Sequence, residues 1–363
     1  MKTAMLGFGV LVAGVLVLVA ALVASNRALD DDVASAASVQ DHGTMTTPAA
    51  TSAKGGMQSF AGITADDAKT LALAHEPVPA TLPPMPDGDV VEVHMVLKDV
   101  TIEIAPGVKY QAWGFEGGVP GPVVHARQGQ LIEMTLTNGG AIPHSIDFHA
   151  ARIAPNEAFV DVMPGKSFTF RFKAADPGVF MYHCGTKPVL AHIANGMYGA
   201  IVVDPVPALP KVEREYVLVA GEWYLSNDGI EKPAQLDMAK ARAIMPDWTA
   251  FNGYAGQYVA HPLTADPGDT VRFYVVDAGP SLTTAFHVVG TIFDTVYPNG
   301  DMRLDHTMKG VQTVDVPAGG GGVFEVKIDE PGLYPFVSHA FAHVDLGQVG
   351  LLKVGNPKGT MSH

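Results

Sequence analysis

The sequence predicts an all-β protein built from two copies of one antiparallel sandwich or barrel domain. From Val90 onward, short runs of alternating apolar and polar residues are separated by glycine and proline, which is typical of β-strands between turns. The segment 192–203 ("HIANGMYGAIVV") aligns without a gap with 343–354 ("HVDLGQVGLLKV"). The two segments lie about 150 residues apart. A repeat of this length is too long for a solenoid and indicates a duplicated domain.

The N-terminal segment has the composition of a leader. Residues 1–26 are apolar and carry no charge between Thr3 and Asn26. They predict either a signal peptide or an N-terminal membrane anchor, and both place the rest of the chain in the periplasm or on the outer face of the cytoplasmic membrane. Residues 27–87 are rich in Ala, Ser, Thr and Asp at first. We expect a disordered, flexible tether there, followed by an approach segment with a short helix at 64–76.

The predicted strands fall into two segments of the chain. The first domain is expected to span 88–205 and the second 211–356, with the stiff linker "PVPALP" between them. A helix is expected in the less regular stretch at 233–245 ("PAQLDMAKARAIM"). The net charge of −14 argues against nucleic-acid binding, which requires basic patches.

The single cysteine, Cys184, has neighbours that suggest a metal site. An unpaired thiol in an exported protein is exposed to oxidation unless it is buried or bound. His192 and Met197 follow it closely, and His144, in a glycine-rich loop after a predicted strand, can supply a second imidazole. A thiolate, two imidazoles and a weak thioether form a blue-copper electron-transfer site, whereas zinc has little use for methionine. The second copy has Gln348 in the place of Met197 and contains no cysteine, so these soft ligands belong to the first copy alone.

Other histidines suggest a second metal next to the first. Neighbouring residues of a strand point to opposite faces, so His183 is expected to face outward when Cys184 faces inward. His149 can join His183 there, and His339, at the equivalent strand end of the second copy, is the best candidate for a third ligand. Three imidazoles and an open position make a catalytic site. Asp147 lies two residues before His149, where it can deliver protons.

Several motifs together resemble one enzyme family. "HSIDFH" and "HCG…H…GM" in the first half, with "SLTTAFHVVGTIFD" and "YPFVSH" in the second, are similar to the copper-containing, nitric-oxide-forming nitrite reductases. The likeness covers about residues 88–356. It implies two Greek-key cupredoxin β-barrel domains in tandem, within the multicopper oxidase superfamily.

The resemblance also implies cofactors and roles. It implies two coppers per chain. The type 1 copper would be held by His144, Cys184, His192 and Met197. The type 2 copper would be held by His149, His183 and, from the adjacent subunit of a homotrimer, His339. Asp147 and His287 would be the catalytic residues. The implied reaction is the one-electron reduction of nitrite to nitric oxide and water, with an external donor such as a cytochrome c or a small blue-copper protein.

Two other functions compete with this interpretation. A laccase-like two-domain multicopper oxidase needs about eight histidines, largely in His-x-His pairs. This chain has no such pair, and Gly185 follows Cys184. A non-catalytic electron carrier would need only the blue-copper ligands. The copper content per chain separates a reductase from a carrier.

Overall fold

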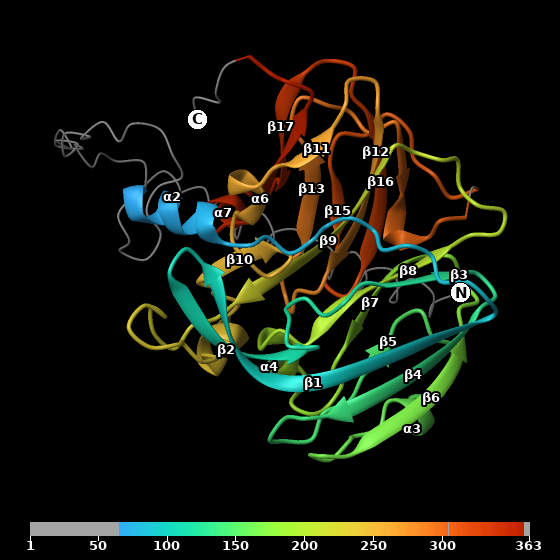
Figure 1. The fold of residues 1–363 in the computed structure, drawn as a ribbon, viewed down its shortest axis with the longest axis vertical. Helices are drawn as coiled ribbons and strands as arrows, with labels where there is room; N and C mark the ends of the chain where they lie inside the picture. Colours follow the sequence, from blue (N-terminus) through green and yellow to red (C-terminus); the bar gives the residue numbers. More distant parts are fainter. Residues whose placement is uncertain (1–64, 304, 359–363) are drawn as a thin grey trace, which may run out of the picture. The chain divides into compact units, whose positions relative to one another are not determined.

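The computed structural model describes residues 65–303 and 305–358 (Figure 1). The expected leader at 1–26 and the expected tether up to residue 64 lie outside the described residues. Within the described residues, no helix is both long enough and apolar enough to span a bilayer. The domain boundaries at 88–205 and 211–356 stay predictions.

The first domain is a sandwich of two four-stranded sheets, with the strand orders β2-β1-β4-β6 and β3-β8-β7-β5. One cluster of buried apolar side chains in its core includes Cys184 and Met197. The strands are β1 (Val90–Ala105), β2 (Val108–Phe115), β3 (Val124–Arg127), β4 (Leu131–Asn138), β5 (Asp147–Phe148), β6 (Ser167–Lys173), β7 (Gly178–His183) and β8 (Tyr198–Asp204).

The second domain repeats this plan with two five-stranded sheets, ordered β10-β9-β12-β16-β14 and β11-β18-β17-β13-β15. Aromatic side chains such as Phe273, Phe286 and Phe336 fill its core. The strands are β9 (Arg214–Trp223), β10 (Trp248–Phe251), β11 (Leu263–Ala265), β12 (Thr270–Asp277), β13 (Thr284–Val288), β14 (Thr295–Tyr297), β15 (Val314–Val316), β16 (Gly321–Lys327), β17 (Gly332–Ser338) and β18 (Val349–Val354).

The expectation of purely antiparallel sheets is wrong in one respect. Each of the four sheets contains one parallel pair: β1 with β4, β3 with β8, β9 with β12, and β11 with β18. The cause is the crossover between sheets. After β2 the chain enters the other sheet as β3 and returns as β4 beside β1, which then runs in the same direction. Alternation of apolar residues reports on strands but carries no information on such crossovers.

Short helices connect the strands. The two helices expected from the sequence are confirmed as α2 (Ala65–Ala74) and α5 (Met238–Ala243). Helix α5 begins after Asp237, whose carboxylate accepts hydrogen bonds from the N–H groups of Ala239 and Lys240. The others are α3 (Pro155–Ala158), α4 (Val189–Ala194), α6 (Gln257–Ala260), α7 (Phe341–Asp345) and the 3₁₀ turn η1 (Pro298–Gly300). Helix α4 joins β7 to β8, and α7 joins β17 to β18.

An apolar core joins the two domains. Val179 and Tyr198 of the first domain pack in one buried cluster with Trp223 and Tyr274 of the second. Gly178 also forms a backbone bridge with Asp301. The domain that carries the cysteine is therefore fixed against the second copy through buried apolar contacts.

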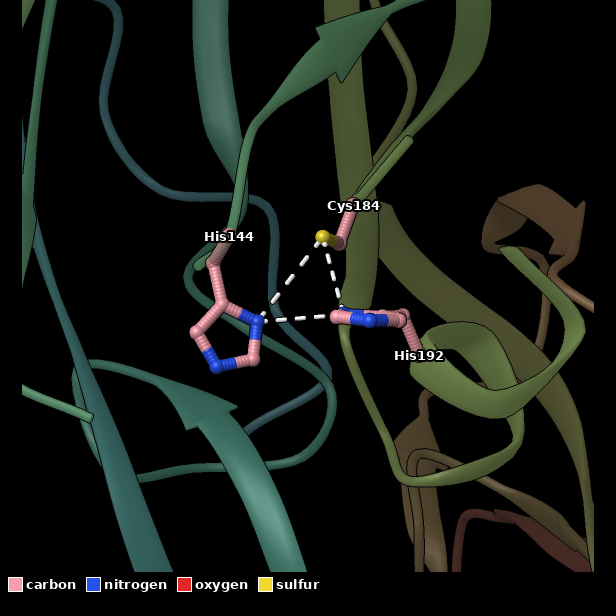
Figure 2. Close-up of side chains that lie close together, drawn as sticks. All are labelled: His144, Cys184 and His192. Atoms are coloured by element: carbon pink, nitrogen blue, oxygen red, sulfur yellow. Dashed lines mark hydrogen bonds between the residues drawn. The ribbon is translucent and has the colours of Figure 1, made fainter. Parts of the chain in front are cut away.

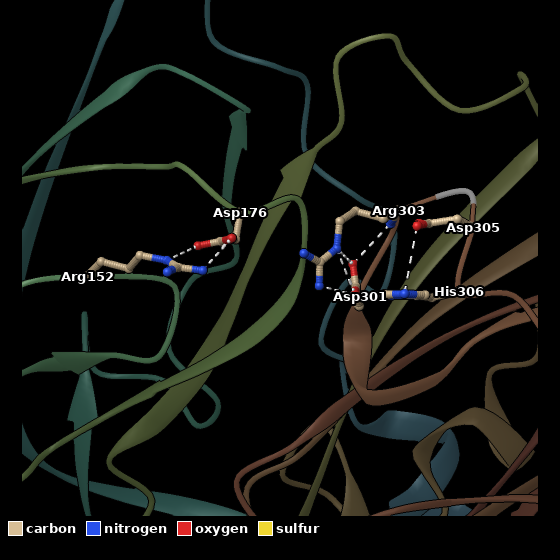
Figure 3. A network of polar contacts seen from close by, with 6 residues as sticks. All are labelled: Arg152, Asp176, Asp301, Arg303, Asp305 and His306. Atoms are coloured by element: carbon tan, nitrogen blue, oxygen red, sulfur yellow. Dashed lines mark hydrogen bonds and ion pairs between the residues drawn. The ribbon is translucent and has the colours of Figure 1, made fainter.

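Two groups of charged pairs lie near the bridge between Gly178 and Asp301 (Figure 3). Arg152 binds Asp176, with Nη2 and Oδ1 2.8 Å apart, while Arg303 and His306 both bind Asp301. The arginines of these pairs are more than half exposed, so solvent screens the attraction. The apolar contacts therefore contribute more to the junction than these ion pairs.

The buried ion pairs of Arg272 in the second domain allow a test of the difference in stability between a buried and an exposed ion pair. Arg272 on β12 is 4% exposed, and its guanidinium bonds Glu215 of β9 at 2.9 Å and Glu325 of β16 at 2.6 Å. We expect Arg272→Met to destabilise the protein by about 3 kcal/mol, because both carboxylates lose their cation. Chemical denaturation measures the loss. The control Arg303→Met removes an exposed arginine and should have a much smaller effect; equal losses would contradict the assignment.

Candidate metal centres

Three ligand-type side chains converge inside the first domain (Figure 2). Cys184 follows β7, His144 lies in the loop after β4, and His192 belongs to α4; their exposed fractions are 0%, 0% and 2%. The Nδ1 atoms of the two imidazoles are 3.1 Å apart. The Cys184 Sγ lies 3.2 Å from His192 Nδ1 and 3.9 Å from His144 Nδ1. One sulfur and two nitrogens therefore face a common point, as a soft transition metal requires.

Met197 is fixed next to this cluster by the main chain. Its N–H donates to the carbonyl of His192 at 3.2 Å, and its carbonyl accepts from the N–H of Cys184 at 3.1 Å. The turn depends on Gly196, whose φ is +102° and where a Cβ would lie 2.5 Å from Val119 Cγ2. The side chain of Met197 is 0% exposed. The sequence "HIANGM" thus folds back so that both ends of the loop meet Cys184.

Burial sets the protonation of the metal-free cluster. It lowers the pKa of His144 to about 4, and the imidazole of His192 adds to this effect. It also lowers the pKa of His192. Burial raises the pKa of the Cys184 thiol, against hydrogen bonds from Ser145 and Thr186. At neutral pH the imidazoles are therefore neutral and ready to bind a metal, which must displace the thiol proton.

Sequence reasoning missed two residues that contact this cluster. Ser145 donates its N–H to Cys184 Sγ at 3.3 Å. Trp113 of β2 packs at an angle against both imidazoles, with ring centroids 5.4 Å from His144 and 5.0 Å from His192. The position of Ser145 directly after His144 was a usable signal, whereas nothing in the sequence near Trp113 pointed to the site.

A second cluster lies on the opposite face of the same strand end. His149, His183 and Asp147 present ligand atoms that lie within 4.8 Å of one another. His149 Nδ1 donates to the Gly319 carbonyl at 2.9 Å, and His183 Nδ1 donates to the Cys184 carbonyl at 3.0 Å. In the neutral rings the two Nε2 atoms then carry no proton, yet they face each other at 3.1 Å. Two lone pairs at this distance repel unless a cation lies between them, so the pair fits a metal.

His339 and His287 lie together in the second domain. His339 is exposed, and its ring centroid is 5.5 Å from that of His287. His287 donates from Nδ1 to the Gln312 carbonyl at 2.6 Å, which leaves its Nε2 free. Within the described part of one chain, His339 does not belong to the cluster of His149 and His183. The role of His339 as a third ligand of that cluster, contributed by an adjacent subunit, stays a prediction.

The strand registers correct one expectation about His339. In the first domain Gly178 of β7 pairs with Val203 of β8, and in the second Gly332 of β17 pairs with Val354 of β18. Gly332 therefore corresponds to Gly178. Val337 then occupies the position of His183, and His339 lies two residues further on, at the position of Gly185. The comparison by sequence aligned His339 with His183 because it matched the two histidines. The strands that precede them, β7 and β17, differ in length.

The same registers place His287 at the position of Asp147. Asp147 pairs with His183, and His287 pairs with Val337 on the equivalent strand. The offset is 140 residues, so 141–150 ("AIPHSIDFHA") aligns without a gap with 281–290 ("SLTTAFHVVG"). The internal repeat therefore contained a signal for His287 that the sequence reasoning did not use.

The second domain contains the same pocket with different side chains. Thr284, Ser338, His343 and Gln348 occupy the positions of His144, Cys184, His192 and Met197. Ser338 Oγ lies 3.2 Å from His343 Nδ1, and it accepts the N–H of Ala285 at 3.2 Å, as Cys184 Sγ accepts that of Ser145. Gln348 Nε2 donates to Thr284 Oγ1 at 2.9 Å. Oxygen atoms thus replace the soft ligands, and the framework of hydrogen bonds stays the same.

Two carboxyl groups are buried beside this second pocket. Asp277 is 2% exposed and Glu222 is 3% exposed, and together with Gln348 they line a cavity of about 10 Å³. Burial raises the pKa of Asp277 to about 7, and the charge of Glu222 contributes. The Oε1 of Gln348 accepts no hydrogen bond. The second pocket is therefore acidic and polar, and it lacks the sulfur ligands of the first.

The fold and the two clusters define a class: a two-domain cupredoxin with two neighbouring candidate metal sites. Multicopper oxidase family models match residues 96–208 and 230–358. These matches confirm the predicted pair of cupredoxin domains. The remaining question is the family within this class.

Comparison with known proteins answers it. A copper-containing nitrite reductase of Neisseria gonorrhoeae is 41% identical over 282 residues, which is 75% of this chain and 71% of that protein. One from Alcaligenes faecalis is 31% identical over 288 residues, covering 73% and 76%. The structure of a copper nitrite reductase from Nitrosomonas europaea matches with a TM-score of 0.68 at 35% identity, covering 74% of this chain and 94% of that one. The chain belongs to the family of copper-containing nitrite reductases, as its motifs predicted.

The raised pKa of Asp277 predicts a pH dependence of stability. The folded protein keeps the proton above pH 4, where an unfolded aspartate has lost it, so this residue makes the free energy of unfolding fall as the pH rises from about 4 to about 7. Asp277→Asn should remove up to about 1.4 kcal/mol per pH unit of this slope. Denaturation at several pH values measures it. The exposed control Asp99→Asn should keep the slope, and an unchanged slope in Asp277→Asn would refute the assignment.

Proposed function

We propose that this protein is a copper-dependent nitrite reductase that takes single electrons from an external donor. The reaction consumes nitrite, one electron and two protons, and forms nitric oxide and water. One observation carries the proposal: the two clusters are joined by the peptide bond between His183 and Cys184. One of them is buried and rich in soft ligands, and the other is open to solvent. This arrangement suits entry of an electron at one centre and chemistry at the other.

The converging atoms support assigning His144, Cys184 and His192 to one centre and His149 and His183 to the other. A type 1 copper would be held by His144, Cys184, His192 and Met197. A type 2 copper would be held by His149, His183 and His339 of a neighbouring chain. When bound, the two coppers supply a one-electron relay and a positive centre for nitrite.

Asp147 has the position of a proton donor. Its carboxyl oxygen lies within 4.8 Å of a ring nitrogen of His149 and of one of His183. A nitrite bound to a metal that these histidines hold would therefore lie near this carboxyl. The half-buried position of Asp147 keeps the group in contact with water, from which it can be protonated again.

His287 would join the site together with His339. The two rings lie next to each other, and the Nδ1 bond to Gln312 orients His287 so that its Nε2 is free. A neighbouring chain that brings His339 to His149 and His183 thus also brings a second proton-transfer group. The proposed homotrimer repeats this contact at three equivalent interfaces and completes every site.

The donor and the compartment belong to the proposal as well. The apolar run at 1–26 supports export to the periplasm or to the outer face of the cytoplasmic membrane, by cleavage or by anchoring. A cytochrome c or a small blue-copper protein is the kind of donor available there. A pure electron carrier would not need the second cluster, and a laccase would need His-x-His pairs that the sequence lacks.

The role of Asp147 can be separated from copper binding. Asp147→Asn should keep the absorption near 600 nm, because the residue does not touch Cys184, and should reduce turnover on the order of 100-fold or more by removing a proton donor. Nitric oxide release with a chemical reductant measures turnover. The exposed control Asp99→Asn should retain normal activity. Full activity of Asp147→Asn would remove this residue from the mechanism.

A complementation experiment tests the shared site. His149→Ala and His339→Ala should each reduce the copper content from two to one per chain and retain the blue colour. Co-expressed with different tags and purified as mixed oligomers, the two variants should regain part of the activity, since an intact His149 can then meet an intact His339.

The same experiment distinguishes the alternatives. No recovery in mixed oligomers would place all ligands in one chain and would contradict the shared site. A wild-type protein with one copper and no turnover would favour the electron carrier.

A further inference from the structure

Residues 78–88 form a strap that runs between α2 and β1 and contacts both domains (Figure 1). At its start, the N–H of Val78 donates to Oε1 of Gln257, in α6 of the second domain, at 2.8 Å. At its end, the Gly88 carbonyl accepts from Nε2 of Gln130, which follows β3 of the first domain, at 2.7 Å. The strap is therefore fastened to both domains by side chains.

The middle of the strap lies along β9 of the second domain. The N–H of Leu82 donates to the Glu215 carbonyl at 3.2 Å, and the N–H of Val217 donates to the Ala80 carbonyl at 2.6 Å. Strand β12 pairs with the other side of β9 at these residues. The strap thus covers an edge of β9 whose peptide groups would otherwise face solvent.

His125 of β3 binds the strap where it reaches the first domain. The residue is 8% exposed; its Nδ1 lies 2.7 Å from the Pro83 carbonyl, and its Nε2 lies 3.2 Å from Oδ2 of Asp204, at the end of β8. A carbonyl oxygen and an ionised carboxylate can only accept hydrogen bonds, so both ring nitrogens must donate. His125 is therefore a charged imidazolium in this arrangement.

The surroundings of His125 favour the charged ring. Burial by itself lowers the pKa of His125, but the hydrogen bonds to Asp204 and Pro83 and the charges of Asp204 and Glu215 raise it above its usual value. Because the pKa of the folded protein then exceeds that of the unfolded chain, about 6.5, this contact stabilises the protein fully below that pH. The contribution is lost as the pH rises through the folded value.

The other charged groups around His125 do not replace it. Arg272 pairs with Glu215 at 2.9 Å. Glu92 and His94 of β1 line the same groove as His125, but their side chains are more than half exposed, so solvent screens their charges. Residues 78–86 of the strap contain no ionisable side chain. His125 is therefore the group through which pH near neutrality acts on this contact.

We propose that His125 is a pH-dependent clamp, which holds the strap on both domains while its ring is charged and loosens it when the ring becomes neutral. A neutral ring has one N–H for two acceptors. The Asp204 carboxylate is the stronger acceptor and draws this proton to Nε2, so the lone pair of Nδ1 then faces the Pro83 carbonyl at 2.7 Å. The hydrogen bond becomes a repulsion, and the covered edge of β9 opens as the strap moves away. The inference depends neither on copper nor on nitrite.

Hydrogen–deuterium exchange of the full, copper-loaded protein tests the clamp. The measured quantity is the protection factor, which compares the exchange rate of an amide with its intrinsic rate at the same pH. Between about pH 6 and about pH 9, the protection of Leu82 and Val217 should fall by at least about 10-fold, because a charge-assisted hydrogen bond is lost. The amides of β12 should keep their protection, since the fold stays intact.

Two variants and a control make the test specific. In Asp204→Asn, the amide can donate to Nε2 of a neutral ring whose Nδ1 donates to Pro83, so the strap should stay protected and the pH dependence should disappear. His125→Gln should also remove the pH dependence, because an amide does not titrate. The control His94→Gln removes an exposed histidine from the same groove and should retain the wild-type profile.

Three results would overturn the proposal. The first is equal protection of the strap at both pH values in the wild-type protein. The second is a wild-type pH dependence in Asp204→Asn or in His125→Gln, because the clamp requires both side chains. The third is a simultaneous loss of protection in the strap and in β12, since the change would then be a global unfolding and not a local release.

Discussion

The alternation of side chains at the end of β7 is the constraint on which both centres depend. Cys184 points into the apolar core, and His183, one residue earlier, points to the opposite face. No loop or hinge separates the two clusters, so their relative position is as rigid as the strand. Pairing of β7 with β5 places Asp147 opposite His183, so the proposed proton-transfer group is fixed by the same sheet.

The two domains show that the framework and the chemistry are separable. The hydrogen bonds that hold Met197 against Cys184 recur between Gln348 and Ser338, although no soft ligand remains there. The backbone of a cupredoxin thus defines four converging positions, and side-chain identity decides whether a metal can bind. In the second domain these positions line a small polar cavity with buried carboxyl groups.

The surroundings of the ligands matter as much as the ligands. Burial keeps the imidazoles of His144 and His192 neutral and the thiol of Cys184 protonated, so the cluster can be loaded by a metal that displaces one proton. At the open cluster, carbonyl oxygens fix the protons of His149 and His183 on Nδ1 and direct both Nε2 atoms to one point. Burial prepares the first cluster for its ligand, and main-chain carbonyls prepare the second.

The sequence by itself determined the all-β class, the duplication and the set of chemically unusual residues, because alternation, repeats and rare residue types are local properties of the chain. It also placed Cys184 and His183 on opposite faces, since strand geometry alone requires this. The tertiary structure decided what depends on contacts between distant segments. These are the parallel strand pairs, the position of His339 relative to His183, and the contacts of Trp113 with the imidazoles of His144 and His192. Each of them depends on which strands and loops meet in space, and the order of residues along one segment does not contain that information.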